Sequence, residues 1–337
     1  QRIFENILIN KIFYLLFSLL VPIFIYLNLN LLYPSNKTNN LIISFTILFI
    51  PYFRASAIWA NAHLTAILFL IISNYFFLLY QKKKNNLYIY LNLFFLSLST
   101  YSIQSYSIFF LYFLTQYFKE IKFANFFLIL LFCFLLSIPG FYLVLLTPLG
   151  GKLDFTENIS YTLLNNFSII FFFILFFIFN LQNLKKINNF FSKLRLNEII
   201  VIFFLYIVLL FNYKIPLTLI GGGFFYKISL FILNTNYLFF FVCFLAILTI
   251  YLIFKLERNL FFLFFLANLT ATGYITSQKY FEPLIIILIL IFCKNFLTKE
   301  LIFKKKNIVI FYLINISYYL IALLNSFYNY SKNVHIN

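Results

Sequence analysis

Residues 62–84 read AHLTAILFLIISNYFFLLYQKKK, an apolar run without a carboxylate or a cation until it ends in three consecutive lysines. A membrane-spanning helix needs roughly 20 apolar residues, and cytoplasmic loops collect Lys and Arg. Apolar runs alternate with basic clusters along the rest of the chain, most clearly at 185–195 and 304–306. The stretch therefore predicts a membrane span followed by a cytoplasmic loop, repeated along the sequence.

The composition supports a membrane protein throughout. The chain has 337 residues, of which 64% are hydrophobic and only 10% charged, and its mean hydropathy is +0.98. A soluble core does not absorb this much apolar surface. We therefore predict an all-α, polytopic transmembrane helix bundle that forms one domain over residues 1–337. The twelve predicted spans are 12–33, 41–53, 62–80, 87–100, 104–118, 123–147, 161–182, 197–213, 237–255, 259–275, 280–295 and 308–326.

The basic residues predict the orientation of the bundle. If residue 1 lies outside and the sides alternate, 17 of the 25 Lys and Arg fall on the inner side and 8 on the outer side. The positive-inside rule then places both termini on the non-cytoplasmic side. The net charge of +17 is explained by anchoring to anionic lipid head groups, and scattered clusters argue against a nucleic-acid partner. Because the chain has no Met and opens at Gln1 without a signal peptide, we expect that a preceding helix and part of the first outer loop are missing.

Polar residues that anchoring does not explain gather on the predicted outer side. They lie in five segments, 51–63, 99–106, 148–157, 221–227 and 276–283. The inner acids Glu120, Glu198, Glu257 and Glu300 each lie beside Lys or Arg and are expected to form solvated surface pairs. Each outer segment also has an ordinary explanation as an interface anchor, a turn or a solvated loop. Their joint placement on one face is what predicts a functional site there.

The order of these segments resembles the GT-C superfamily of integral membrane glycosyltransferases, in particular its members that depend on polyprenyl-phosphate or dolichyl-phosphate sugars. The stretch Phe53-Arg54-Ala55-Ser56-Ala57-Ile58-Trp59, continuing to Lys84, is similar to the outer turn, long helix and basic loop of that superfamily. Leu98-Ser99-Thr100-Tyr101-Ser102-Ile103-Gln104 resembles its Thr/Phe-x-x-Gln step. Lys279-Tyr280-Phe281-Glu282-Pro283 matches its Arg-Tyr-x-x-Pro motif with Lys in place of Arg.

The resemblance implies a transferase that moves a sugar from a polyprenyl-phosphate donor on the non-cytoplasmic face. It departs from the superfamily at one point, because the first outer loop, which carries the catalytic acid there, is expected to be mostly or wholly missing, with Glu5 as the sole acid of its tail. Either that acid lies upstream, or Glu5 or Asp154 does its work, or the chain is inactive. A fixed cation near the donor phosphate stabilises charge on the leaving group, and a carboxylate deprotonates the acceptor hydroxyl. The predicted site residues are Glu5 and Asp154 as catalytic acids, Arg54, Lys227 and Lys279 for the donor phosphate, and His63, Gln104, Gln278, Tyr280 and Glu282 for the substrate.

Other functions stay open at the level of the sequence. A lipid-linked oligosaccharide polymerase or ligase also uses outer arginines, and a non-enzymatic carrier or flippase fits the composition. A proton-pumping subunit is disfavoured, since nearly every charge lies at the end of a span rather than in its middle. The sequence shows no metal-binding signature, although a divalent metal is a further candidate cofactor. Membrane lipid is the expected surrounding partner, in a bacterial inner membrane or an ER-type membrane, and the oligomeric state stays undetermined.

Overall fold

A computed structural model describes residues 7–146, 159–179, 192–213, 223–270 and 278–334. Regular structure in these residues is helical, and no strand occurs among them, which confirms the predicted all-α class. The first half holds α1 (Ile7–Ser18), α2 (Leu20–Leu32), α3 (Lys37–Ser44), α4 (Pro51–Ile58), α5 (Ala62–Lys83), α6 (Leu87–Ser102), α7 (Phe109–Glu120) and α8 (Phe123–Leu146). Short 3₁₀ segments, η1 (Pro34–Asn36), η2 (Phe45–Phe49) and η3 (Gln104–Ile108), join some of them.

The second half continues as helices of more varied length. It holds α9 (Ile159–Ile178), α11 (Leu196–Phe211), α12 (Gly223–Leu233), α13 (Tyr237–Leu256), α14 (Arg258–Leu269), α15 (Gln278–Ile287), the π-helix η4 (Leu288–Phe292), α16 (Phe296–Phe303) and α17 (Lys305–Val334). All twelve predicted segments overlap helix within the described residues.

The twelve predicted crossings are not confirmed. Six helices of the described chain are long and apolar enough to cross a membrane, or up to eight if two sharply bent pairs each count as one span. The bent pairs are Pro34–Phe49 with Pro51–Ile58, at 70°, and Phe281–Phe292 with Phe296–Phe303, at 81°. The helices in the remaining predicted spans are too short to cross a membrane. For example, α7 and α14 have 12 residues each. Such a helix is about 18 Å long, whereas the hydrocarbon core is about 30 Å thick.

The α5 helix shows how the opening stretch forms its element. The Asn61 side chain accepts a hydrogen bond from the backbone N–H of His63, which caps the first turn. Lys82 and Lys83 lie in the last turn, where a cation interacts favourably with the helix dipole. The helix ends at Lys84, whose φ of +54° is left-handed. The predicted span is therefore a 22-residue helix with a signal at each end.

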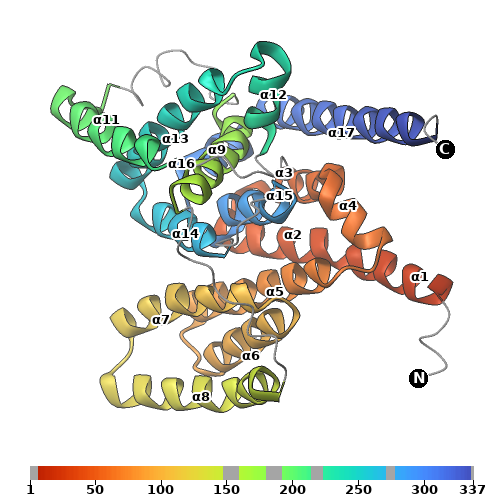
Figure 1. The fold of residues 1–337 in the computed structure, drawn as a ribbon. Coiled ribbons are helices and arrows are strands. Elements are labelled where there is room, and N and C mark those ends of the chain that lie inside the picture. Colours follow the sequence, from red (N-terminus) through yellow and green to blue (C-terminus); the bar gives the residue numbers. More distant parts are fainter. Residues whose placement is uncertain (1–6, 147–158, 180–191, 214–222, 271–277, 335–337) are drawn as a thin grey trace.

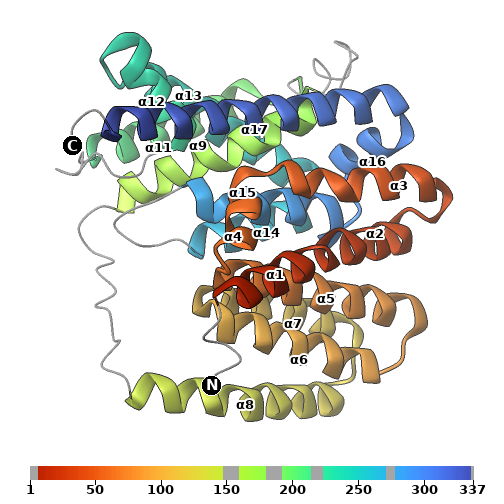
Figure 2. The ribbon, with the colours of Figure 1, turned by 90° about the vertical axis from the view of Figure 1, so that its right-hand side faces the viewer.

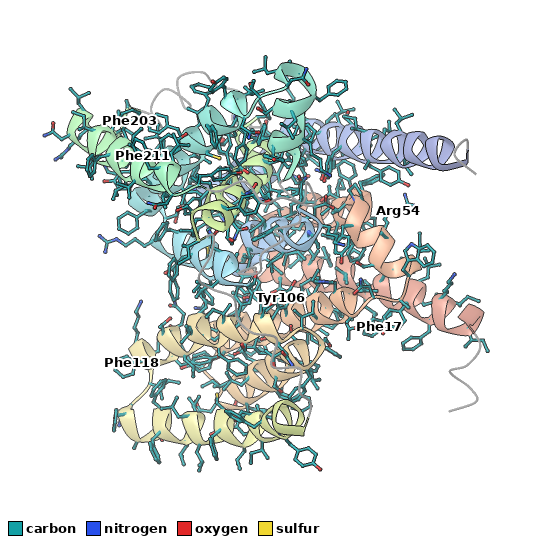
Figure 3. All side chains as sticks on the ribbon, viewed as in Figure 1. Phe17, Arg54, Tyr106, Phe118, Phe203 and Phe211 are labelled. Carbon is teal, nitrogen blue, oxygen red and sulfur yellow. The ribbon has the colours of Figure 1, made fainter. Side chains whose placement is uncertain are left out.

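The helices pack in layers around α15 and η4 (Figures 1 and 2). The side chains from Leu284 to Phe292 are at most 1% exposed, which makes this segment the most buried of the described chain. On one side lie α2, α5, α6 and α7, with α8 outermost, and on the other lie α9, α13 and α17. Aromatic side chains such as Phe118, Phe203 and Phe211 lie at the periphery (Figure 3), as a lipid-facing surface requires.

A network of buried amides connects the central helices. The Asn74 side-chain amide donates to Asn28 Oδ1 at 2.9 Å and to the Ile291 carbonyl at 2.8 Å, which joins α5 to α2 and to η4. Asn92 donates to Ser73 and accepts from the Tyr117 hydroxyl, which joins α6 to α5 and α7. Hydrogen bonds of this kind between helices hold them together where lipid supplies no hydrophobic drive.

Three ion pairs each join two residues that are predicted to lie on the same side of the membrane. Lys84 pairs with Glu120 at 2.5 Å, Lys255 with Glu198 at 2.8 Å and Lys304 with Glu300 at 3.9 Å, all among residues assigned to the inner side. Three of the four inner acids therefore form the expected ion pairs. Which end of the bundle faces the cytoplasm stays a prediction.

Glu257 differs from the other inner acids. It is half-buried, its carboxylate accepts a hydrogen bond from the backbone of Phe296, and burial raises the pKa of this carboxyl. It lies between α13 and α14, at the start of the latter. The expectation of a solvated pair is wrong for this residue, because the start of α16 packs over it.

Candidate functional site

A tight turn between α4 and α5 brings three predicted site elements together. Pro51 begins α4 after Ile50 in an extended conformation, and Pro at this position leaves no backbone donor unpaired. The helix ends at Ile58, and Ala60 has a φ of +52° before Asn61 caps α5. Arg54 is thereby placed at the same end of the bundle as the start of α15 (Figure 3), where Lys279 acts electrostatically on His63 of α5.

Glu282 of α15 lies at the centre of this region. The side chain is 6% exposed, although it is a carboxylate. Its Oε2 accepts a hydrogen bond from the backbone N–H of Tyr52 at 3.0 Å, and its Oε1 accepts one from the Tyr318 hydroxyl of α17. The first turn of a helix leaves backbone donors unpaired and carries positive partial charge. The buried carboxylate therefore caps α4 from another helix and ties α4, α15 and α17 together.

Gln278 extends the network to α12. Its side-chain amide donates from Nε2 to the Tyr318 hydroxyl at 2.9 Å, and its Oε1 accepts from the backbone N–H of Phe224 at 2.6 Å. Phe224 lies in the first turn of α12, so the glutamine caps this helix as Glu282 caps α4.

At Gly223, one residue of the glycine run 221–223, the structure explains why glycine is required. Its φ is +60°, and a Cβ placed there meets the Ile169 Cγ1 atom at 2.7 Å. Only glycine satisfies both conditions, since other residues rarely adopt this φ and have no room for a side chain here. The absence of a side chain lets α12 approach α9 and present its backbone to Gln278.

The cations of the region lie on the two helices that the Tyr52–Glu282 hydrogen bond joins, Arg54 on α4 and Lys279 on α15. The Arg54 guanidinium lies 4.7 Å from the centre of the Tyr319 ring, next along α17 from Tyr318. Lys279 is exposed and acts electrostatically on His63, whose ring lies 5.5 Å from that of Tyr52. We refer to these residues as the outer-end cluster: Tyr52, Arg54, His63, Gln278, Lys279, Glu282, Tyr318 and Tyr319.

The geometry of the outer-end cluster suits anion binding. Arg54 and Lys279 are both exposed, and their helices, α4 and α15, are joined by the hydrogen bond from Tyr52 to Glu282. Both oxygens of Glu282 already accept hydrogen bonds, so this carboxylate holds the helices in place and is poorly placed to remove a proton. Two exposed cations on helices joined in this way can bind a phosphate oxygen.

The predicted site residues divide into three groups. Arg54, His63, Gln278, Lys279 and Glu282 come together in the outer-end cluster. Lys227 is exposed on α12, and Gln104 lines a separate cavity beside α8. Glu5, Asp154 and the side chain of Tyr280 lie outside what the structure describes. Among the described residues, no three His, Cys, Asp or Glu side chains lie close enough to hold a metal ion.

Sequence reasoning missed the contribution of α17 and of Tyr52. Tyr318 and Tyr319 stand in an apolar helix among many other aromatic residues, so their composition gives no signal. An adjacent pair of tyrosines in a predicted span is the one feature that could have drawn notice, since a buried hydroxyl requires a partner. Tyr52 contributes through its backbone N–H, which leaves no trace in residue type.

The fold and the cluster define a multi-helix membrane protein with a polar, cation-bearing site at one end of its bundle. No family model, curated protein or solved structure matches the chain. Function is therefore argued from the site itself.

Proposed function

We propose that this protein is a membrane glycosyltransferase that transfers a sugar from a polyprenyl-phosphate donor to an acceptor on the non-cytoplasmic face. The observation that carries the proposal is the outer-end cluster, in which the exposed Arg54 and Lys279 lie on the two helices that the buried Glu282 joins. A polyprenyl-phosphate donor presents its phosphate at the membrane surface. The exposed cations lie at the end of the bundle, where such a phosphate is reached without crossing the hydrocarbon core.

Arg54 and Lys279 act in this proposal as the donor-phosphate ligands. The bond from sugar to phosphate breaks with negative charge building on the phosphate oxygens, and a cation held in place before the reaction stabilises that charge. Tyr319 restrains the Arg54 guanidinium from one face. His63 and Gln278 are then substrate contacts, with Gln278 fixed by the start of α12. Glu5 and Asp154 remain the candidates for the base that deprotonates the acceptor hydroxyl.

A carrier or flippase for an anionic lipid-linked substrate is the second candidate, and the two bent helix pairs favour it. Transporters commonly place discontinuous helices at their substrate sites, with helix N-termini facing the anionic group. The bend of 70° before α4 leaves the first turn of that helix beside the cluster. Here Glu282 occupies part of that turn, which reduces its capacity for a second anion.

The decisive experiment measures sugar transfer in membranes from radiolabelled polyprenyl-phosphate sugars, with and without added divalent metal. We expect Arg54→Ala and Lys279→Ala each to lower kcat/KM by roughly 10- to 100-fold, which corresponds to the loss of one charge-assisted hydrogen bond of about 1.5–3 kcal/mol. Lys305→Ala is the matched control, because Lys305 is exposed at the opposite end of the bundle. This control should transfer sugar at the wild-type rate.

The same preparations separate the two candidates. Proteoliposomes loaded with a fluorescent lipid-linked sugar report movement across the bilayer without transfer. Transfer that is lost in both variants supports the enzyme. Movement across the bilayer that depends on Arg54 and Lys279, in the absence of any transfer, overturns the enzyme in favour of the carrier.

A further inference from the structure

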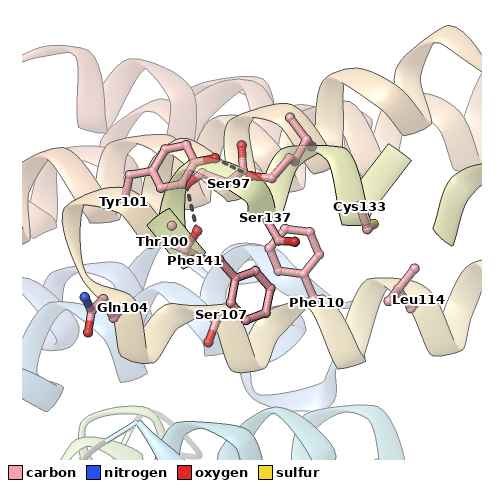
Figure 4. Close-up of a pocket in the computed structure, with 12 residues that line it drawn as sticks. Ser97, Thr100, Tyr101, Gln104, Ser107, Phe110, Leu114, Cys133, Ser137 and Phe141 are labelled. Atoms are coloured by element: carbon pink, nitrogen blue, oxygen red, sulfur yellow. Dashed lines mark hydrogen bonds between the residues drawn. The ribbon is translucent and has the colours of Figure 1, made fainter. Parts of the chain in front are cut away.

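A cavity of about 480 Å³ lies apart from the outer-end cluster, between α6, η3, α7 and α8. Its walls include Thr100 and Tyr101 near the end of α6, Ser107 in η3, and Ser137 and Gly140 on α8. The size falls in the range of about 300–1,000 Å³ that small-molecule sites occupy. Figure 4 shows the lining side chains converging on one space from α6, η3, α7 and α8.

The cavity is polar at one end and apolar at the other. Gln104 and Ser107 stand at one end of the row in Figure 4, and Leu114 and Cys133 at the other. Within the part of the chain that the structure describes, the side chains of Gln104 and Ser107 have no hydrogen-bond partner. Both residues are exposed, and both lie in η3 at the mouth of the cavity. These two side chains are therefore available to a ligand.

The lining carries no charged side chain. Its polar members are Ser, Thr, Tyr and Gln, which offer neutral donors and acceptors. The hydroxyls of Ser97, Thr100 and Ser137 donate to backbone carbonyls in their own helices and keep their lone pairs free. A phosphate or carboxylate would find no cation here to balance its charge. An uncharged hydroxyl, which both donates and accepts, matches this set.

The position of α8 indicates where such a ligand comes from. The helix packs only against α6 and α7 among its closer neighbours, and Phe127, Phe134 and Phe141 are exposed along it. One hydrogen bond links its middle to α6, from the Tyr101 hydroxyl to the Leu136 carbonyl. A hydrocarbon chain from the bilayer can therefore lie between α8 and the rest of the bundle.

We propose that this cavity binds a single-chain membrane lipid with an uncharged, hydroxyl-bearing head group, of the monoacylglycerol kind. The head group lies at Gln104 and Ser107, and the chain extends toward Leu114 and Cys133. The proposal does not depend on the glycosyltransferase activity, because the cavity and the outer-end cluster share no residue. It can hold whether or not sugar transfer is found.

The test uses the purified full chain in phosphatidylcholine nanodiscs and a monoacylglycerol that carries a photoreactive diazirine at the end of its acyl chain. Labelling should map to the peptides that contain Leu114 or Cys133. Ser137→Phe fills the cavity, and Ile138→Phe places the same side chain at the neighbouring, exposed position of α8. We expect Ser137→Phe to reduce labelling by about tenfold or more and Ile138→Phe to leave it unchanged.

A second part of the experiment tests the chemistry of the lipid head group. Gln104→Leu keeps the volume and removes the hydrogen bonds, so it should weaken competition by unlabelled monoacylglycerol by about three- to tenfold. Lysophosphatidic acid of the same chain length should compete poorly with wild type. Equal competition by the anionic lipid, or labelling indifferent to Ser137→Phe, overturns the proposal. If Ser137→Phe fails to fold, Gln104→Leu on the opposite wall decides the result.

Discussion

Glu282 is the residue on which the outer end of the bundle depends. A carboxylate with 6% of its surface exposed is costly unless hydrogen bonds satisfy it, and two donors from different helices do so here. The Tyr318 hydroxyl also accepts from Gln278, so that one hydroxyl connects two polar side chains of α15. Removal of this hydroxyl leaves Glu282 Oε1 and Gln278 Nε2 without a described partner, while Tyr52 and Phe224 still donate to the other oxygen of each side chain.

The first prediction compares the two neighbouring tyrosines of α17. We expect Tyr318→Phe to lower the free energy of unfolding by about 1–3 kcal/mol, the cost of leaving a buried polar group unsatisfied. Tyr319→Phe keeps the ring that lies over Arg54 and should change stability by less than about 0.5 kcal/mol. Unfolding by denaturant in detergent micelles measures both values. Equal losses in the two variants would show that the Glu282 contact contributes nothing special.

At the scale of elements, the broken segment from α15 to α16 is the least regular part of the fold. The π-helix η4 precedes a bend of 81°, and such a break leaves carbonyl groups without their usual helical partners. Asn295 satisfies two of them, donating to the Ile289 carbonyl at 2.6 Å and to the Cys293 carbonyl at 3.1 Å. Its Oδ1 accepts from the backbone N–H of Thr298 and so caps α16.

The second prediction follows from these bonds. Asn295→Ala should destabilise the protein by about 2–3 kcal/mol, since it removes the cap of α16 and the donor to the Cys293 carbonyl, while the Ile289 carbonyl keeps the Thr298 hydroxyl. Asn85→Ala is the matched control: the Asn85 Oδ1 also accepts from a backbone N–H, that of Leu87, but the site is exposed. Asn85→Ala should lower the free energy of unfolding by less than about 1 kcal/mol, because water replaces the lost hydrogen bond. A comparable loss in the two variants, by the same denaturation assay, would contradict the account of the break.

The whole molecule is a bundle with two distinct ends. Ion pairs such as Lys255 with Glu198 lie at one end, and the outer-end cluster lies at the other. The start of α1 and the end of α17 lie on the same side of the bundle, as an even number of crossings requires (Figure 1). The charge distribution predicts that this side is non-cytoplasmic.

The third prediction tests the orientation with one helix. Ala62 and Gln81 are both exposed and lie near opposite ends of α5. In a chain whose Cys133, Cys243 and Cys293 are replaced by Ala, we expect a membrane-impermeant maleimide to label Ala62→Cys in intact cells. Gln81→Cys should react only after permeabilisation. The reverse pattern would invert the topology and place the cluster on the cytoplasmic side.

Much of the fold was predictable from local pattern. The apolar runs located the helices, because a helix in lipid satisfies its own backbone and needs only length and apolar side chains. Counting crossings was less successful: the runs around 104–118 and 259–275 contain helices too short to cross by themselves. The sequence predicted on which side of the bundle the candidate site lies and which residue types form it, as Arg54, Lys279 and Glu282 illustrate. Its geometry was not predictable, because Tyr52 and Glu282 stand 230 positions apart in the sequence.

The class of protein, the positions of most helices and the gathering of polar residues at one end of the bundle therefore follow from the sequence. These properties depend on composition and on neighbours along the chain. Three features follow from packing between distant segments: Tyr52 and Tyr318 hold Glu282, Gln104 lines a separate cavity, and α15 continues into a buried π-helix. Each of these depends on how helices rotate and pack against one another, and packing between distant segments follows from shape and hydrogen bonding that no single stretch of sequence contains.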